Sequence, residues 1–405
     1  MNAYAIRMLA MLALVTASSS SVETSSHARA LNPAMAQKEA CSQGVMEITE
    51  SLTLDPACRY GPIRITRSDV VLDCNGATID LAYGALYGIV IAPPEGLGEL
   101  RNVVVRNCKI RRAERHGLYV GGIGCDRDKL QHSREQRYCL HPQNILIENV
   151  AVELNGNTGL YIDDYVSDVT IRNSRFVRNA GVGIYLEHHS RRTRIQGNSF
   201  VENGHGPRYV KFANVHREAI AVDASQYNVI EDNRFDGNYA GGIFLYRNCW
   251  EKPEDRCQVD REIGADHNII RRNNIERSRV GIWIASRQHR SADTPVCGQR
   301  PDPSEGIYND DAKRNRVSDN VIHNVERGIV IEDDHNIVER NTISDAKKAC
   351  VVVGSQQRMA QFGVPVVGVE VSDNLCRLRP GQTDDAAIAV VKGTGARIDG
   401  NRVKP

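Results

Sequence analysis

Three carboxylates in similar local contexts carry the chemistry that this sequence offers. Asp163, Glu187 and Asp223 each lie at the end of a short apolar segment, and Tyr161 and Tyr185 precede the first two by two residues. Grouped carboxylates can act as acid and base, or can hold Ca²⁺, which prefers oxygen ligands. Their mutual repulsion must be offset by a cation, a shared proton or a nearby Arg or His. We therefore treat these three residues as candidate catalytic residues and as a candidate calcium site.

Basic and aromatic residues nearby extend this set. Tyr185 and His188 offer a base and an acid, and Arg247 offers a cation that could neutralise a substrate carboxylate. Aromatic rings suit the apolar C–H faces of sugars, and basic loop residues suit an anionic ligand. The candidate substrate-binding residues are Tyr161, Lys211, His216, Arg217, Tyr246 and Trp283. Each feature also has a purely structural interpretation. The carboxylates could be solvated residues at strand ends, the tyrosines could form a stack that binds no ligand, and the basic loop could simply be solvated.

Internal repeats predict how these residues are positioned. The phrase NILIENVAVELNGNTGLYIDD from Asn144 returns as YNVIEDNRFDGNYAGGIFLYRN from Tyr227. Each unit has a β-branched strand, an Asn-containing bend, one apolar residue, a polar turn and a strand that begins with glycine, here called the Gly-led strand. Asn suits the bends because it tolerates left-handed geometry and its amide can bond along a ladder. Ile147, Ile171 and Ile195 recur every 24 residues, as coils of a solenoid would, and only stacking lets such short strands bury a face.

The repeats resemble those of the pectate-lyase-like superfamily of right-handed parallel β-helix proteins, within it the group with NosD-type and mannuronan C5-epimerase-type repeats. The resemblance implies an all-β, single-stranded right-handed parallel β-helix with loop insertions. In this superfamily the sheet equivalent to the Gly-led strands floors a polysaccharide cleft. Its calcium-dependent lyases use stacked carboxylates with Arg or Lys as base, a role that would fall to Arg247 or Lys211. We expect an N-terminal cap over residues 31–57 and the β-helix over 58–405.

Insertions point to the face formed by the Gly-led strands. Three insertions follow such strands, at residues 121–142, 247–266 and 287–313, and a fourth, at 204–218, precedes one. Aligning the strands by coil places their outward residues in two columns. The first column is Tyr119, Tyr161, Tyr185, Ala221, Phe244, Trp283 and Val330. The second column is Gly121, Asp163, Glu187, Asp223, Tyr246, Ala285 and Glu332. We expect the carboxylates of the second column to be exposed and to contribute little to stability.

The first residues predict export. A charged start, an apolar run over residues 8–17 and the sequence Ala28-Arg29-Ala30 match a cleaved signal peptide over residues 1–30, so we expect a periplasmic or secreted protein. No apolar run reaches the roughly 20 residues of a membrane span, so we expect no membrane insertion.

Cysteine usage and charge narrow the class further. Eleven cysteines in an exported chain predict disulfides, and proximity in sequence suggests Cys125 with Cys139 and Cys249 with Cys257, which leaves Cys297 over. A formal net charge of +1 excludes the global basic field typical of nucleic-acid binders. We expect a monomer whose partner is an acidic polysaccharide.

The constellation favours removal of the C5 proton of a uronate. Polysaccharide lysis and C5-epimerisation both begin by neutralising the carboxylate and abstracting that proton. Glycoside hydrolysis by a carboxyl pair is the alternative reaction, although the Asp-Asp and Gly-His-Gly signatures of β-helix hydrolases are absent. A non-catalytic periplasmic protein that binds a glycan or a metal is the third class. The Asp-Pro-His-Asp signature of alginate epimerases is absent, which counts against epimerase specificity.

Overall fold

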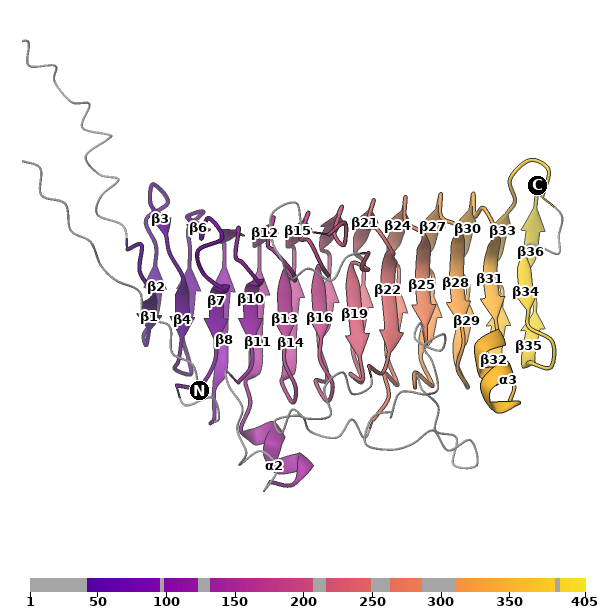
Figure 1. The fold of residues 1–405 in the computed structure, drawn as a ribbon, viewed down its shortest axis with the longest axis horizontal. Helices are drawn as coiled ribbons and strands as arrows, with labels where there is room; N and C mark the ends of the chain where they lie inside the picture. The colour runs from indigo at the N-terminus through magenta and orange to yellow at the C-terminus, as the bar shows by residue number, and fades with distance from the viewer. Residues whose placement is uncertain are drawn as a thin grey trace, which may run out of the picture. The chain divides into compact units, whose positions relative to one another are not determined.

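The protein is described by a computed structural model over residues 42–94, 98–122, 132–206, 216–248, 263–285, 311–382 and 387–405. These residues belong to one compact unit, Ala40–Pro405. The chain winds in successive coils, and each coil adds one strand to each of three parallel sheets of 12 strands (Figure 1). The expected parallel β-helix is confirmed.

The three sheets take every third strand in chain order. Sheet A holds the Gly-led strands: β1 (Met46–Ile48), β4 (Ile63–Ile65), β7 (Tyr87–Ile91), β10 (His116–Val120), β13 (Leu160–Ile162), β16 (Ile184–Leu186), β19 (Ile220–Asp223), β22 (Gly241–Tyr246), β25 (Val280–Ile284), β28 (Arg327–Ile331), β31 (Ala349–Val353) and β34 (Ile388–Val390). Sheet B holds the β-branched strands: β2 (Leu52–Thr53), β5 (Val71–Asp73), β8 (Arg101–Arg106), β11 (Gln143–Glu148), β14 (Ser167–Arg172), β17 (Arg194–Gln196), β20 (Val229–Glu231), β23 (Ile269–Arg271), β26 (Arg316–Ser318), β29 (Ile337–Glu339), β32 (Val367–Ser372) and β35 (Gly395–Asp399). Sheet C holds β3 (Arg59–Tyr60), β6 (Thr78–Asp80), β9 (Lys109–Arg111), β12 (Ala151–Glu153), β15 (Arg175–Val177), β18 (Ser199–Val201), β21 (Arg234–Asp236), β24 (Asn274–Glu276), β27 (Val321–His323), β30 (Thr342–Ser344), β33 (Leu375–Arg377) and β36 (Arg402–Lys404).

The core is a stack of equivalent apolar side chains. Ile147, Ile171 and Ile195 pair in register on adjacent strands of sheet B and are fully buried, as the 24-residue period predicts. Sheet C contributes one inward residue per strand, and the rings of Phe176 and Phe200 stack with centroids 5.1 Å apart. The isolated apolar residue of each repeat is therefore the centre of a third strand, which the repeat pattern did not reveal as a strand.

Glycine begins the sheet A strands because the adjacent coil leaves no room for a side chain. A Cβ on Gly183 would lie 2.8 Å from the carbonyl oxygen of Ala219 and 2.9 Å from a ring carbon of Phe200. Gly117 is similarly enclosed, with a Cβ 2.5 Å from Val152. The same close approach recurs from coil to coil, and the residues of adjacent sheet A strands pair in register.

Asparagine ladders run along the bends. In the later coils, however, the residue with left-handed backbone geometry and the asparagine that forms the ladder are two different residues. From Asn198 onward each buried amide donates to the next at 2.9 to 3.0 Å. The left-handed residue is then the one before, such as Asp232 or Arg272. In earlier coils Asn107 and Asn149 themselves have positive φ. Assigning both roles to the same asparagine was therefore wrong for the later coils, because the buried amide occupies the next position.

The insertions lie at the connections predicted for them. The residues that join β10 to β11 include α2 (Arg134–Cys139), which begins with a capping box between Ser133 and Gln136. The long connections from β22 to β23, from β25 to β26 and from β18 to β19 also adjoin sheet A strands. A second short helix, α3 (Gln356–Phe362), follows β31. In the described part of the chain no helix has the length and apolarity needed to cross a membrane.

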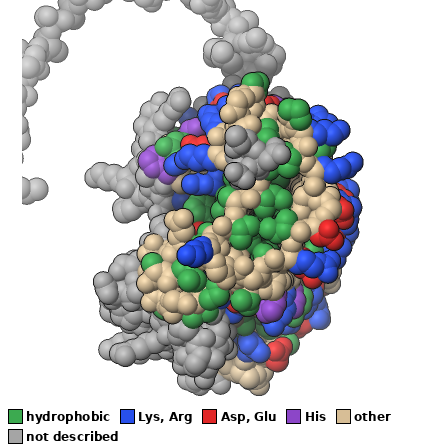
Figure 2. Space-filling view, turned by 90° about the vertical axis from the view of Figure 1, so that its right-hand side faces the viewer, with side chains coloured by type: hydrophobic (Ala, Val, Ile, Leu, Met, Phe, Trp, Pro, Cys, Tyr) green, Lys and Arg blue, Asp and Glu red, His purple; other side chains and the backbone are tan. Residues whose placement is uncertain are grey.

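The strands of the solenoid run from Met46 to Lys404. Strands β1 and β2 precede residue 58, so coil formation begins within the range expected for the cap. Figure 2 views the molecule from the C-terminal end and shows hydrophobic side chains between charged ones. Exposed apolar residues of the last coil include Val390, Ile398 and Val403.

Two disulfides between described residues join adjacent coils. Cys74 pairs with Cys108 on the adjacent coil, with a Cα–Cα distance of 4.8 Å, and Cys350 pairs with Cys376 at 5.9 Å. Cys139 is exposed and forms no disulfide, so the predicted pairing with Cys125 is wrong. Proximity in sequence misled because coiling brings distant cysteines together. The predicted pair Cys249–Cys257, and Cys297, lie outside the described residues.

Candidate functional site

The two outward columns of sheet A are in the register that the sequence predicts. Tyr119, Tyr161 and Tyr185 pair directly on β10, β13 and β16. Asp223 pairs with Tyr246, two positions further along the strands. The structure therefore brings the predicted tyrosines and carboxylates onto one face.

A regular hydrogen-bond pattern connects the columns. Each aromatic donor in the first column donates to the carboxylate that lies one coil further in the second column, and we call this set the aromatic–carboxylate ladder. Its pairs are Tyr119 with Asp163, Tyr161 with Glu187, Tyr185 with Asp223 and Trp283 with Glu332. The Tyr185 hydroxyl lies 2.6 Å from Asp223 Oδ2, and Trp283 Nε1 lies 2.8 Å from Glu332 Oε2.

The carboxylates of the ladder are more buried than expected. Asp223 is 0% exposed and Glu187 is 9% exposed, so the prediction of solvated side chains was wrong for these two. Asp223 accepts from the Tyr185 hydroxyl and from the Asn248 backbone N–H. Those donors offset the cost of removing the carboxylate from water.

The same contacts hold the tyrosines in the neutral form. Burial raises the pKa of Tyr185 well above its usual value, and the Asp223 carboxylate adds to that effect. Burial and the neighbouring Glu187 and Asp163 do the same for the pKa of Tyr161. Tyr185 therefore rests as a phenol near neutral pH, and it can transfer a proton only together with its partner.

The tyrosine rings also stack along the axis. Ring centroids lie 5.8 Å apart for Tyr119 and Tyr161, and 5.2 Å apart for Tyr161 and Tyr185. The His116 ring stacks on Tyr161 at 4.8 Å, and burial lowers its pKa well below the usual value. The same tyrosines therefore form both a stack of rings and the aromatic–carboxylate ladder, because the rings pack on each other while their hydroxyls donate to the carboxylates.

Arg217 supplies a cation beside the ladder. Its guanidinium donates to both oxygens of Glu218 at 2.9 and 3.1 Å and to the Tyr246 hydroxyl at 2.7 Å. Its Cζ lies 5.8 Å from the Tyr185 ring centroid. Burial disfavours the charge on Arg217, but the Glu218 carboxylate outweighs this and raises the arginine pKa well above its usual value. Glu218 was missed by the sequence reasoning, although its position directly after Arg217 was a signal.

Arg247 lies in a different environment. Its side chain is 1% exposed, and Nη1 lies 3.7 Å from Asp311 Oδ2. Lys313 also pairs with Asp311 at 3.1 Å, and Arg358 pairs with Asp333 at 2.8 Å. In the described part of the chain, Arg247 therefore forms an ion pair within a buried charge network, whereas Arg217 lies beside the Tyr185 ring. The geometry favours Arg217 over Arg247 as the cation for a ligand on sheet A.

Of the remaining predicted residues, His188 lies beside the ladder, His216 lies against Tyr239, and Lys211 is not described. His188 donates its backbone N–H to Glu187 Oε1 at 3.1 Å, and its Nδ1 lies 3.4 Å from that of His189. Burial, with His188 nearby, lowers the pKa of His189 to about 2. The exposed His216 stacks on Tyr239 with centroids 4.3 Å apart. Lys211 lies outside the described residues.

The candidate calcium site does not fit the geometry. Among the described residues, no group of three or more His, Cys, Asp or Glu side chains is arranged to hold a metal ion. Asp163, Glu187 and Asp223 lie on successive coils, and each accepts a tyrosine hydroxyl. The tyrosine donors already offset part of the repulsion between these carboxylates, so the arrangement does not require a metal.

Comparison with protein families agrees with this architecture. The model described as "Right handed beta helix region" matches residues 87–261, and the model described as "Periplasmic copper-binding protein (NosD)" matches residues 257–362. No curated protein sequence matches the chain.

Solved structures show the same fold. The A-module of mannuronan C-5 epimerase AlgE6 from Azotobacter vinelandii is 13% identical, with 88% of this chain and 91% of that chain covered and a TM-score of 0.53. The tailspike protein of E. coli bacteriophage HK620, solved in complex with a pentasaccharide, is 13% identical with a TM-score of 0.51, and the match covers 89% of this chain and 60% of that chain. The chain is therefore a right-handed parallel β-helix protein. Within that class its repeats are similar to those of NosD and of the mannuronan C5-epimerase modules.

Proposed function

We propose that the protein is an exported carbohydrate-active enzyme that acts on a uronate-containing polysaccharide by removing the C5 proton, as a polysaccharide lyase or C5-epimerase. The observation that carries the proposal is the Tyr185–Asp223 hydrogen bond with Arg217 beside the tyrosine ring. A proton-transfer pair and a permanent cation are the two parts that C5 chemistry requires. The similarity to NosD, described as periplasmic, supports a periplasmic location.

Tyr185 acts in its neutral form in this mechanism. As the phenolic oxygen takes up the C5 proton, its own proton passes to Asp223 along the existing 2.6 Å hydrogen bond. Free tyrosinate is never formed, which matters because burial and Asp223 make that anion unfavourable. His188 remains the proposed acid that protonates the leaving oxygen or the opposite face of C5.

The substrate is aligned along the outward face of sheet A in this proposal. Arg217 contacts the uronate carboxylate, and Tyr161 and Trp283 pack against sugar rings of the chain. Tyr246 is 1% exposed and donates its hydroxyl proton to Glu218, so it positions Arg217 and does not contact the substrate. The structural relatives act on or were solved with saccharides according to their names, and this supports a glycan rather than another polymer.

Hydrolysis is the second candidate reaction because of the coil spacing. Carboxylates on adjacent coils stand about 4.8 Å apart by strand spacing. That separation is close to the roughly 5–5.5 Å of retaining glycosidases. The hydrogen bonds from the tyrosines disfavour this reading, since they occupy the carboxylates that would attack or protonate the sugar.

Product analysis tests the proposal. The protein is incubated with polymannuronate, polyguluronate, polygalacturonate and a neutral glucan. Unsaturated ends detected by ultraviolet absorbance would support a lyase, and inversion at C5 seen by NMR would support an epimerase. Saturated reducing ends would instead show hydrolysis and overturn the C5 mechanism, and no turnover of any acidic polymer would overturn the enzymatic assignment.

A further inference from the structure

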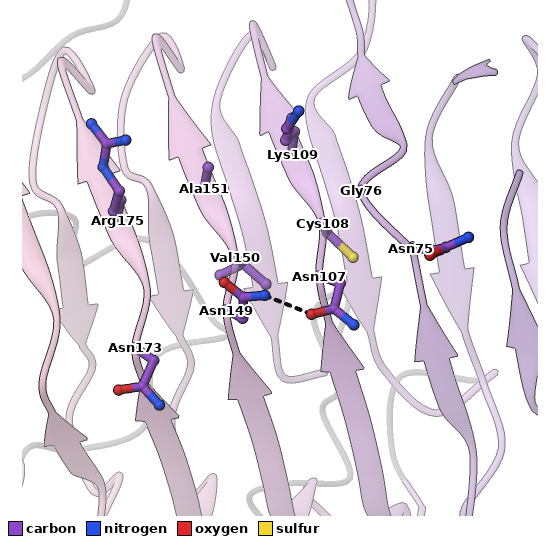
Figure 3. A pocket seen from close by; sticks show the side chains of 10 residues that line it. All are labelled: Asn75, Gly76, Asn107, Cys108, Lys109, Asn149, Val150, Ala151, Asn173 and Arg175. Atoms are coloured by element: carbon purple, nitrogen blue, oxygen red, sulfur yellow. Dashed lines mark hydrogen bonds between the residues drawn. The ribbon is translucent and has the colours of Figure 1, made fainter. Parts of the chain in front are cut away.

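A second polar groove lies away from sheet A. It has a volume of 360 Å³ and opens at the bend between sheets B and C in the N-terminal half of the solenoid (Figure 3). Its lining comes from the bends that follow β5, β8, β11 and β14 and from the strands β9, β12 and β15. None of the ladder residues lines it, so this groove is a separate feature.

Two cations flank a small residue in this groove. Lys109, Ala151 and Arg175 are in register on three adjacent strands of sheet C. Adjacent strands are about 4.8 Å apart, so the two basic residues start about 10 Å apart along the axis, with a gap above Ala151 between them. Repeated negative charges on an extended polymer could occupy both positions.

These two cations differ from their neighbours in having no acidic partner in the described part of the chain. Arg106 pairs with Asp73 at 2.9 Å, and Arg172 pairs with Glu148 at 2.6 Å, as do many basic residues along sheets B and C. Lys109 and Arg175 are both exposed and enter no such pair. Their charge is therefore available to an external anion.

Amide groups complete the lining. Asn149 donates to Asn107 at 2.7 Å, and Asn107 donates to Asp73 at 2.8 Å, which fixes the orientation of these amides (Figure 3). Asn173, the next bend residue, makes no such side-chain hydrogen bond within the described ranges and offers both a donor and an acceptor. The Cys74–Cys108 disulfide stiffens the groove floor, so little ordering is needed on binding.

We propose that this groove is a non-catalytic binding site for a linear acidic polysaccharide that runs along the solenoid axis. Lys109 and Arg175 contact carboxylates of the polymer, and the Asn149 and Asn173 amides contact its hydroxyls. No aromatic side chain lines the groove, which disfavours single-stranded nucleic acid, whose bases stack on such rings. The site would hold a long chain on the protein while sheet A acts on another part of it. The substrate class rests on the proposed function, but the binding itself does not require turnover.

Binding is measured with full-length alginate by affinity electrophoresis and calorimetry at low salt. The probe protein carries Tyr185→Phe and Asp223→Asn, so that any turnover on sheet A is suppressed. Adding Lys109→Gln and Arg175→Gln should weaken binding roughly ten-fold or more, since two charge-assisted contacts are lost. Arg234→Gln is the matched control, because Arg234 occupies the same column of sheet C and pairs with Glu276 at 2.9 Å.

Three results would contradict the proposed binding site. The first is that no acidic polysaccharide binds. The second is that Arg234→Gln weakens binding as much as the Lys109 and Arg175 changes do, and the third is that neutral dextran or double-stranded DNA binds as tightly as alginate. Loss of turnover in the proposed-function assay together with retained, Lys109- and Arg175-dependent binding would reject the enzyme and keep the groove. The reverse pattern would reject only the groove.

Discussion

Tyr185 donates a 2.6 Å hydrogen bond to Asp223, a carboxylate that lies one coil further along the solenoid and is fully buried. The pairing joins two coils that are separated by an insertion of the chain between β18 and β19. The phenol is held neutral and already donates its proton to a carboxylate, so we place the proposed proton transfer on sheet A at this pair.

Tyr185→Phe should lower turnover by about 10²-fold or more while leaving substrate affinity nearly unchanged. The ring and its stacking on Tyr161 remain, and only the phenolic oxygen is lost. Tyr119→Phe is the matched control, since it removes the same kind of hydrogen bond at a pair further from Arg217. Equal rates for wild type and Tyr185→Phe on a uronate polymer would remove Tyr185 from the reaction.

Asp223→Ala and Asp223→Asn should differ in stability. The alanine leaves the Tyr185 hydroxyl and the Asn248 N–H without their buried acceptor, at a cost of about 1–3 kcal/mol per unsatisfied group. The asparagine keeps an oxygen acceptor and should lose less. Asp163→Ala, at a partly exposed position, should fall between wild type and Asp223→Ala in denaturant unfolding. Identical unfolding midpoints for all four proteins would mean that the ladder carries no stability.

The repeat pattern was sufficient to predict the fold and the register of sheet A. Ile147, Ile171 and Ile195 report the coil period directly, and the glycines mark where the coil leaves no space for a side chain. The strands of sheet C were not predicted, because each has a single inward residue, such as Phe176, and therefore shows no alternation of apolar and polar residues.

The site was only partly predictable for a different reason. The sequence places Tyr185 and Asp223 in neighbouring columns, but the offset of one coil between donor and acceptor depends on side-chain direction. Arg247 is close to the columns in sequence, yet the chain turns at that point and buries the guanidinium against Asp311. Position along a strand predicts a face, whereas a corner residue can point into the molecule.

Arg217 and Arg247 should therefore give different phenotypes. The double change Arg217→Gln with Glu218→Gln replaces a bidentate ion pair by a neutral pair, so the buried charges leave together. KM for a uronate polymer should rise about ten-fold or more, since hydrogen bonds to charged groups contribute about 1.5–3 kcal/mol. Arg247→Gln should instead lower stability by about 1–3 kcal/mol, because Asp311 loses one cationic partner and keeps Lys313. A raised KM with unchanged stability in Arg247→Gln would reverse this assignment.

Chelation should leave activity unchanged. The ladder carboxylates already accept tyrosine hydroxyls, and no cluster of metal-binding side chains is found within the described ranges. Exhaustive dialysis against EDTA, followed by assay in metal-free buffer, is the measurement. Loss of activity that Ca²⁺ restores would contradict this prediction and support the calcium mechanism.

The buried charge network around Asp333 should make stability fall as pH rises. Among the described residues it holds four carboxylates and three cations, and this excess of negative charge favours protonation of one carboxyl group. The carboxylates are Asp266, Asp311, Asp333 and Asp334, and the cations are Arg247, Lys313 and Arg358. Burial, with Asp311 nearby, raises the pKa of Asp333 from 3.8 to about 8, and this outweighs the 2.8 Å ion pair with Arg358.

A raised folded-state pKa gives a stabilising contribution that is complete below the unfolded pKa of 3.8 and is lost as pH rises through about 8. Between about pH 5 and pH 7 the folded protein then binds one proton more than the unfolded chain. The free energy of unfolding should fall by about 1.4 kcal/mol per pH unit from this group. Asp333→Asn cannot titrate, so its denaturant-derived stability should show a slope that is less negative by that amount. Parallel slopes for wild type and Asp333→Asn would mean that Asp333 is ionised in the folded protein and that Arg358 prevails over burial.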